Sequence, residues 1–310
     1  MTRVPSNLAQ VFTLSPWEGV GVRGLIAPDV SGALTRVRCA GTTYTRGRGG
    51  TALAVGVLLV LVALAAPAIA DDALGKAYVL HLPGIGGERM IDHTLVGGLK
   101  AGGLGGVFRI YDWTGGEPGL LALTAVQRNQ VKATAISAII VEQANADPRR
   151  PIVLTCHSGG AGLAAWALEQ LPQGVMVDAW LMVAPALSPH YDLSAALRHV
   201  RRRAYTINSQ GDIVLGQGTR MFGTIDGVKS DAAGRVGFVR PDGADAKQYE
   251  KLTQLPYDVA WLKLGNAGDH VGAMNTRFAR EVLAPLLLTG KVPHIQPATG
   301  PTSAPAAAAR

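Results

Sequence analysis

The sequence predicts an α/β protein built on a mostly parallel, doubly wound sheet with helices on both faces. Short apolar runs of strand length alternate with longer helix-like stretches from Lys76 onward. Such alternation is typical of strand–helix–strand units and therefore of a parallel sheet. Several polar residues also follow the ends of the apolar runs directly, which is where open parallel sheets place their sites.

The elements are expected in a regular order along the chain. Strands are predicted at 77–82, 107–111, 151–154, 175–183, 204–208 and 258–264. Helices are predicted at 120–146, 161–171, 193–200 and 271–288. Two of these helices end where a proline follows, at Pro148 and Pro172, because proline cannot continue a helix. Residues 215–250 are rich in Gly and Asp, and we expect them to be mostly loops.

The two ends of the chain differ from its middle. Residues 1–50 show no sustained periodicity, and we interpret them as a disordered or mis-assigned N-terminal extension. We expect the globular domain to span 71–290 and the Pro/Ala-rich stretch 291–310 to be a disordered tail.

Residues 51–70 resemble a secretory signal peptide. Arg46 and Arg48 precede an almost wholly apolar run, and Ala68-Ile69-Ala70 ends it. A basic flank, an apolar core and a small-residue end are the three parts of a cleavable leader. About 20 apolar residues could also just span a bilayer, so a retained membrane anchor is the alternative. Either interpretation predicts an exported domain, and only residues 51–70, if uncleaved, would contact the membrane.

Composition excludes several function classes. The net charge is +7, but residues 1–70 carry six Lys and Arg against two Asp and Glu, which leaves +3 on the remainder. That balance is too mild to predict a nucleic-acid partner. With Cys39 in the extension, Cys156 has no partner for an intramolecular disulfide. No phosphate loop, dinucleotide fingerprint or zinc-type spacing is present, so neither a cofactor nor a metal is expected.

The sequence Thr155-Cys156-His157-Ser158-Gly159-Gly160 joins a predicted strand to a predicted helix. A serine on such a turn is the nucleophile-elbow arrangement, in which a sharp, strained turn needs small neighbours. Gly160 meets that need, and Gly162 is expected to let the helix pack close to the sheet. Cys156 occupies a position where the usual pattern has glycine.

Two further residues complete a catalytic constellation. Asp212 follows the predicted strand at 204–208, and His270 follows the one at 258–264. Serine is a poor nucleophile, so His270 would take the proton of Ser158 while Asp212 orients the imidazole. Each residue alone has an ordinary explanation, as a turn residue or a helix cap. Their joint order at strand ends favours a triad, and Asp269 ranks below Asp212 as the acid because adjacent residues seldom face each other.

An oxyanion hole is the fourth expected part. The backbone N–H groups of Gly159 and Ile85 are the predicted donors, and Gly84 and Gly86 would let the Ile85 loop approach a substrate. We interpret His81 and His157 as packing or rim residues. Trp113 and Trp166 could line the pocket or pack in the core, and core packing is the favoured interpretation.

These motifs together resemble the α/β-hydrolase superfamily over about residues 76–288. The matching segments are Pro83-Gly84-Ile85-Gly86-Gly87, Cys156-His157-Ser158-Gly159-Gly160, Gly211-Asp212-Ile213-Val214 and Gly268-Asp269-His270. The resemblance implies an esterase, lipase or related acyl hydrolase that works through an acyl-enzyme without a cofactor. About 20 residues separate the strands at 175–183 and 204–208, which leaves little room for a cap domain. We therefore expect a lightly covered site with 215–250 as its wall.

The leading hypothesis is an exported serine hydrolase acting on small-molecule or lipid esters of carboxylic acids. An acyltransferase or a peptidase would use the same residues, because pocket shape decides the acceptor. A non-catalytic binding module on this fold and a membrane-anchored surface protein are the alternatives from other classes.

Overall fold

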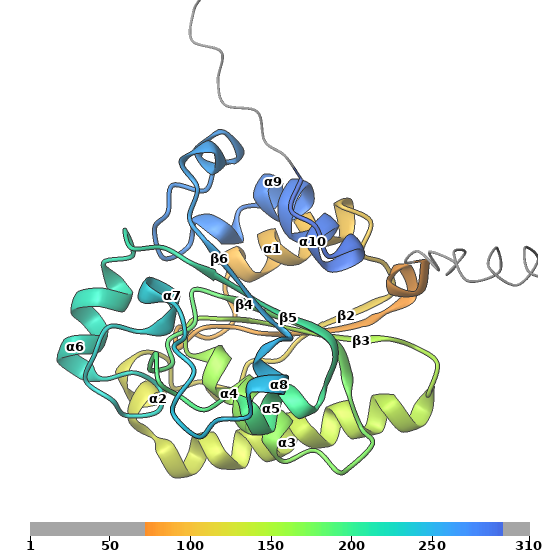
Figure 1. The fold of residues 1–310 in the computed structure, drawn as a ribbon, viewed down its shortest axis with the longest axis horizontal. Helices are drawn as coiled ribbons and strands as arrows, with labels where there is room; N and C mark the ends of the chain where they lie inside the picture. The colour runs from red at the N-terminus through yellow and green to blue at the C-terminus, as the bar shows by residue number, and fades with distance from the viewer. Residues whose placement is uncertain (1–71, 294–310) are drawn as a thin grey trace, which may run out of the picture. The chain divides into compact units, whose positions relative to one another are not determined.

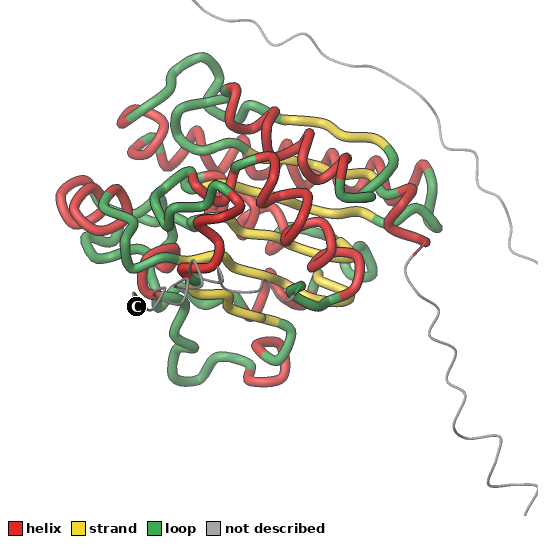
Figure 2. Tube along the Cα trace, turned by 90° about the horizontal axis from the view of Figure 1, so that it is seen from above, coloured by secondary structure: helices red, strands yellow, loops and turns green. Residues whose placement is uncertain are grey.

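The computed structural model describes residues 72–293. The expected N-terminal extension, the 51–70 segment and the tail beyond residue 293 lie outside the described residues. Within the described part, six strands form one sheet in the order β2-β1-β3-β4-β5-β6, and every neighbouring pair is parallel. They are β1 (Tyr78–Leu82), β2 (Val107–Ile110), β3 (Ile152–His157), β4 (Val177–Val183), β5 (Val200–Asn208) and β6 (Leu252–Pro256). Figure 2 shows them side by side.

Helices cover both faces of this sheet (Figure 1). On one face lie α1 (Met90–Ala101), α9 (Thr276–Phe278) and α10 (Ala284–Thr289). On the other face lie α2 (Leu120–Thr124), α3 (Val126–Ala146), α4 (Gly160–Glu169) and α5 (Ser194–Arg198). The connection between β5 and β6 carries three short helices, α6 (Thr219–Phe222), α7 (Ala233–Val236) and α8 (Ala246–Tyr249). The remaining turns are 3₁₀ at Asp72–Lys76, Val259–Leu264 and Gly272–Met274, and π at Val214–Gly218 and Ala279–Leu283.

Alternate residues of the strands supply the two hydrophobic cores. Leu80 and Leu154 pack into the core beneath α3 and α4, whereas their neighbours Val79 and Val153 pack into the core beneath α1 and α10. Side chains on a strand point to opposite faces in turn, so a sheet covered on both faces needs apolar residues at successive positions. Both β3 and β4 are buried along their whole length. The predicted doubly wound parallel sheet is confirmed.

Two element predictions were wrong, and one helix was missed. The last strand is β6, at Leu252–Pro256, and the predicted strand at 258–264 is a 3₁₀ helix. The Asp258 side chain accepts a hydrogen bond from the Ala260 N–H at the start of that helix, and Gly265 closes it in the left-handed conformation. Helix α1 was not predicted, because Gly97 and Gly98 interrupt its apolar pattern. The stretch 120–146 is two helices that meet at Ala125.

The closing segment is helical as predicted from Thr276 to Thr289, but it contains a π turn, and its first part is a separate 3₁₀ turn. Among residues 72–293, none of the helices combines the length and the apolar character that a membrane crossing requires. Between β4 and β5 the chain forms only the short α5, so no cap domain is inserted there, as predicted.

Candidate active site

Ser158 sits on a strained turn between β3 and α4. Its φ angle is +51°, in the left-handed region that residues with a side chain rarely adopt. A β-carbon on Gly160 would lie 2.5 Å from the Pro83 carbonyl oxygen and 2.6 Å from that of Leu82, so only glycine fits there. This is the geometry of a nucleophile elbow, which projects the serine side chain above the carboxyl edge of the sheet. Gly162 has a different role from the one predicted, because it makes room for Ile225 rather than for the sheet.

The structure brings Ser158, His270 and Asp212 together in one hydrogen-bonded line. The Ser158 Oγ and His270 Nε2 are 3.0 Å apart, and His270 Nδ1 lies 2.8 Å from Asp212 Oδ2. Ser158 and Asp212 are buried, and the His270 side chain is 16% exposed. The imidazole therefore reaches solvent on one side while the serine and the carboxylate hold it in place.

Backbone groups hold the acid of this line in a fixed position. Asp212 follows β5, and its Oδ1 accepts a hydrogen bond from the Leu215 N–H at 2.9 Å, which leaves Oδ2 for His270. The neighbouring carboxylate, Asp269, instead accepts hydrogen bonds from the N–H groups of Val271 and Gly272. Asp269 therefore orders the turn after His270, and the lower rank given to it as the acid agrees with this geometry.

The two predicted oxyanion donors lie against each other. A β-carbon on Gly159 would be only 2.6 Å from the Ile85 Cγ2 atom. In the described part of the chain, neither the Ile85 N–H nor the Gly159 N–H donates a hydrogen bond to a protein acceptor. Buried or half-buried backbone donors normally find partners, so these two N–H groups are left for an acceptor from outside the chain.

Contacts from the β2 side fix the loop that carries Ile85. The Gly119 N–H donates to the Ile85 carbonyl at 2.6 Å. The Trp113 indole N–H donates to the Pro83 carbonyl at 2.7 Å, and Trp113 is fully buried, as its interpretation as a core residue predicted. Gly84 lies close to the serine turn, because a β-carbon there would lie 3.1 Å from His157 Nδ1 and 3.2 Å from the Ser158 β-carbon.

His157 has a more specific place than the packing role predicted for it. It is buried, its Nε2 lies 3.0 Å from the His270 carbonyl oxygen, and the two rings are 4.8 Å apart. Burial, helped by the charge of His270, lowers the pKa of His157 to about 3. A neutral imidazole donates its Nε2–H to the His270 carbonyl and fixes the backbone of that residue. Its position next to Ser158 was the only sequence signal for this contact.

Cys156 takes no part in the chemistry of this edge. It is fully buried, accepts a hydrogen bond from the Trp180 indole N–H at 3.4 Å, and burial raises its pKa to about 12. A thiol in that state is a poor nucleophile. No group of three or more His, Cys, Asp and Glu within residues 72–293 is arranged to hold a metal ion.

A pocket of about 280 Å³ opens at Ser158. Around Ser158, His157 and His270, its walls are formed by Gly84, Ile85, Gly86, Gly87, Arg89, Ile91, Asp92, Gly119, Val214 and Val271. The prediction that 215–250 would be the wall is wrong, since Val214 is the one residue of the β5–β6 connection that lines it. The segment packs elsewhere: Ile225 fills the space over Gly162, and Gly234 lies against the backbone of Ala184.

Comparisons with known proteins found likeness in structure only. No protein-family model matches the chain, and a search of curated proteins found no match. A cutinase-like protein from Cryptococcus sp. is 12% identical, with 71% of this chain and 98% of that chain covered and a TM-score of 0.38. Lipase B of Aspergillus fumigatus is 14% identical, with 69% of this chain and 52% of that chain covered and a TM-score of 0.44. The match therefore spans about half of that lipase. An acetylxylan esterase is 13% identical, with 70% of this chain and 98% of that chain covered and a TM-score of 0.41.

These likenesses assign no activity to the chain. The architecture follows from its own geometry: a parallel sheet with helices on both faces, and a strained serine turn at the end of a central strand. The described residues have an α/β-hydrolase-like fold.

Proposed function

We propose that the chain is a serine hydrolase that cleaves carboxylic esters through an acyl-enzyme on Ser158. The observation that carries the proposal is the hydrogen-bonded line from Ser158 Oγ through the His270 imidazole to Asp212, at 3.0 and 2.8 Å. Those distances are within the range that proton transfer to a general base requires. The φ angle of +51° at Ser158 supports the same role, because strain of this kind concentrates at functional sites.

The reaction would begin when His270 Nε2 takes the proton of Ser158 Oγ as that oxygen attacks the ester carbonyl carbon. Negative charge then develops on the carbonyl oxygen, where the N–H groups of Ile85 and Gly159 would donate to it. His270 returns the proton to the alcohol as the carbon–oxygen bond breaks. Water then repeats the sequence on the acyl-enzyme and releases the acid. Asp212 keeps the imidazole oriented and stabilises its charged form.

The substrate class follows from the size of the pocket. Its volume of about 280 Å³ is just below the roughly 300–1,000 Å³ of small-molecule sites. Apolar side chains of Ile85, Ile91, Val214 and Val271 line it. We therefore propose short-chain esters, rather than long-chain lipids, as the preferred substrates.

Hydrolysis of a p-nitrophenyl ester series from acetate to laurate tests both statements. Ser158→Ala is expected to lower kcat by about 10⁶-fold, while wild type prefers the short esters. Ser188→Ala is the matched control, because Ser188 is equally buried, at 6% exposure, and is expected to keep wild-type turnover. Equal activity of Ser158→Ala and wild type would overturn the proposed nucleophile, and a preference for laurate would overturn the proposed substrate class.

The export of this domain is also a proposal, and it rests on the leader-like pattern of residues 51–70. Expression in a host with a secretory pathway, followed by N-terminal sequencing of the exported protein, is the test. A new N-terminus at Asp71 is expected. An exported chain that still contains residues 51–70 would support the anchor instead.

A further inference from the structure

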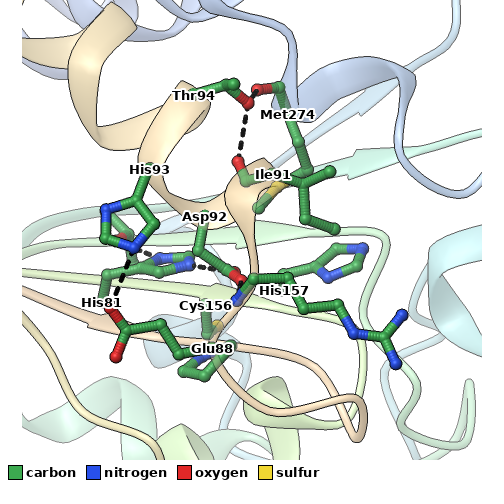
Figure 3. A network of polar contacts seen from close by, with 12 residues as sticks. His81, Glu88, Ile91, Asp92, His93, Thr94, Cys156, His157 and Met274 are labelled. Carbon is green, nitrogen blue, oxygen red and sulfur yellow. Dashed lines mark hydrogen bonds and ion pairs between the residues drawn. The ribbon is translucent and has the colours of Figure 1, made fainter.

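A second His–Asp pair lies at the same edge of the sheet, and the proposed reaction does not use it. His81 is the next-to-last residue of β1, and its Nε2 is 2.9 Å from Asp92 Oδ1 in the first turn of α1 (Figure 3). Its Nδ1 is 2.9 Å from the Thr155 hydroxyl on β3. The side chains of His81 and Asp92 are 0% and 1% exposed. Both ring nitrogens are therefore occupied by protein partners in the interior.

Asp92 connects this histidine to the end of a loop. Its Oδ2 accepts a hydrogen bond from the Arg89 backbone N–H at 2.8 Å, while its Oδ1 is hydrogen-bonded to His81 Nε2. Both oxygens face protein donors, although the residue lies at the edge of the pocket. Both carboxylate oxygens thus accept hydrogen bonds from the protein, and the carboxylate holds β1 and Arg89 together.

The segment between these two points is the loop that carries Ile85. It leaves β1 directly after His81 and Leu82 and ends at Arg89, where α1 begins. Trp113, Gly119 and Asp112 hold the loop from the β2 side, through the Pro83 and Ile85 carbonyls and the Glu88 N–H. The His81–Asp92 pair joins the two ends of the loop to each other.

Helix α1 is itself fixed on its other side. The Thr94 hydroxyl lies 2.9 Å from the Met274 carbonyl oxygen, in the 3₁₀ turn that follows His270 (Figure 3). The helix that supplies Asp92 is therefore anchored to the histidine loop. A shift of Asp92 would move the Ile85 loop relative to Ser158 and His270.

We infer that the His81–Asp92 pair is a positioning device for the oxyanion hole. It fixes the two ends of the loop so that the Ile85 N–H points with that of Gly159 at the developing oxyanion. Such donors stabilise the transition state only when they are held in place beforehand, and a displacement of about 1 Å can cost about 10²-fold in rate. The inference rests on the proposed function.

The test uses the full chain and compares two replacements of Asp92. Asp92→Ala removes both hydrogen bonds and is expected to lower kcat for p-nitrophenyl acetate by about 10- to 100-fold, with KM almost unchanged. It should also weaken inhibition by phenylboronic acid, whose tetrahedral adduct on Ser158 presents an oxygen to the oxyanion hole. Asp92→Asn can still accept from the Arg89 N–H and donate to His81 Nε2, so it is expected to recover most of the loss. If Asn is as damaging as Ala, the charge matters rather than the geometry, and the inference is wrong.

Asp178→Ala is the matched control for loss of a buried carboxylate. Asp178 is also buried and also accepts a backbone hydrogen bond, from the Ile152 N–H at 2.9 Å, but at the opposite end of the strands. It is expected to lower stability without changing kcat at temperatures where the protein is folded. An equal loss of kcat in both variants would show a general effect of destabilisation and overturn the inference.

Thr155→Val keeps the test decisive if Asp92→Ala does not fold. It removes only the hydroxyl that holds His81 Nδ1, and a smaller loss of kcat with unchanged KM is expected. Turnover within about twofold of wild type in a folded variant would contradict the inference. A folded wild type that hydrolyses none of the esters would instead overturn the proposed function, so the two failures are distinguishable.

Discussion

The two His–Asp pairs of this chain share their chemistry and differ in their surroundings. His270 joins Asp212 to Ser158, and His81 joins Asp92 to Thr155, with all four hydrogen-bond distances between 2.8 and 3.0 Å. The His270 ring is 16% exposed and lines the pocket, whereas the His81 ring is 0% exposed. Distances alone therefore do not identify a catalytic histidine.

The difference lies in the hydroxyl at the end of each line. Thr155 is inside β3 in regular strand geometry, so its side chain remains buried against the neighbouring strand, where it contacts His81. Ser158 comes three residues later on the turn with positive φ, which lifts its hydroxyl out of the sheet and into the pocket. One short stretch of chain thus supplies both a hydroxyl that holds a histidine inside the protein and a hydroxyl that lines the pocket.

Replacing each aspartate by asparagine is expected to separate the two pairs most strongly. Asp212→Asn should lower kcat by about 10⁴-fold, because the amide favours the wrong tautomer of His270 and cannot stabilise its charged form. Asp92→Asn should lower kcat by less than about tenfold, since a neutral amide can still form the hydrogen bonds to His81 and the Arg89 N–H. Steady-state hydrolysis of p-nitrophenyl acetate measures both. Similar losses in the two variants would mean that the pairs do not differ as described.

Substitutions of two glycines sharpen the comparison by moving the oxyanion loop directly. In Gly159→Ala the new methyl would meet Ile85 Cγ2 at 2.6 Å and push the loop away, so a loss of about 10²-fold in kcat is expected. Gly97→Ala is the control, because Gly97 lies inside α1 with no atom within 4 Å of the new methyl. It should keep full turnover and raise stability by about 0.5–1 kcal/mol. Full activity of Gly159→Ala would contradict the placement of the donors.

Replacing the third histidine of this region, His157, is expected to have the smallest effect, which is a change in how stability depends on pH. Burial lowers its pKa from the ordinary value of 6.5 to about 3. Between those pH values the unfolded chain binds a proton that the native chain does not, so the wild type should lose stability as pH falls from 6.5 towards 3. His157→Gln removes this contribution, while its amide can still donate to the His270 carbonyl. Urea unfolding at pH 7 and 4.5 should show that the free energy of unfolding falls less in the variant than in the wild type. An equal fall in the two proteins would contradict the buried neutral state of His157.

The strand ends were predictable from sequence because they depend on local patterns. Apolar runs identified five of the strands, and the polar residues directly after them identified Ser158 and Asp212. The structure places His270 beside Ser158 and Asp212, although the segment predicted as the strand before it is a 3₁₀ helix. The weak pattern of β6 has a physical cause: it is an edge strand, and its residues are only half-buried or exposed.

The His81–Asp92 pair could not be predicted in the same way. The two residues are joined through a glycine-rich loop and through a helix that the sequence pattern did not reveal, and their third partner, Thr155, is 74 residues from His81. Contacts of this kind depend on the register between β1 and β3, which pairs His81 with Thr155. A sequence pattern carries no information on that register until the sheet order is known.

Mapping the site of fluorophosphonate labelling by mass spectrometry tests the central claim most directly. The reagent bonds a serine oxygen to its phosphorus and releases fluoride, which requires an activated and accessible hydroxyl. We predict one phosphonyl group per chain, on the peptide that contains Thr155 and Ser158, with fragmentation placing it on Ser158. A His270→Ala variant should label far more slowly. A folded wild-type protein that stays unlabelled, or that carries the group on another residue, would contradict the account.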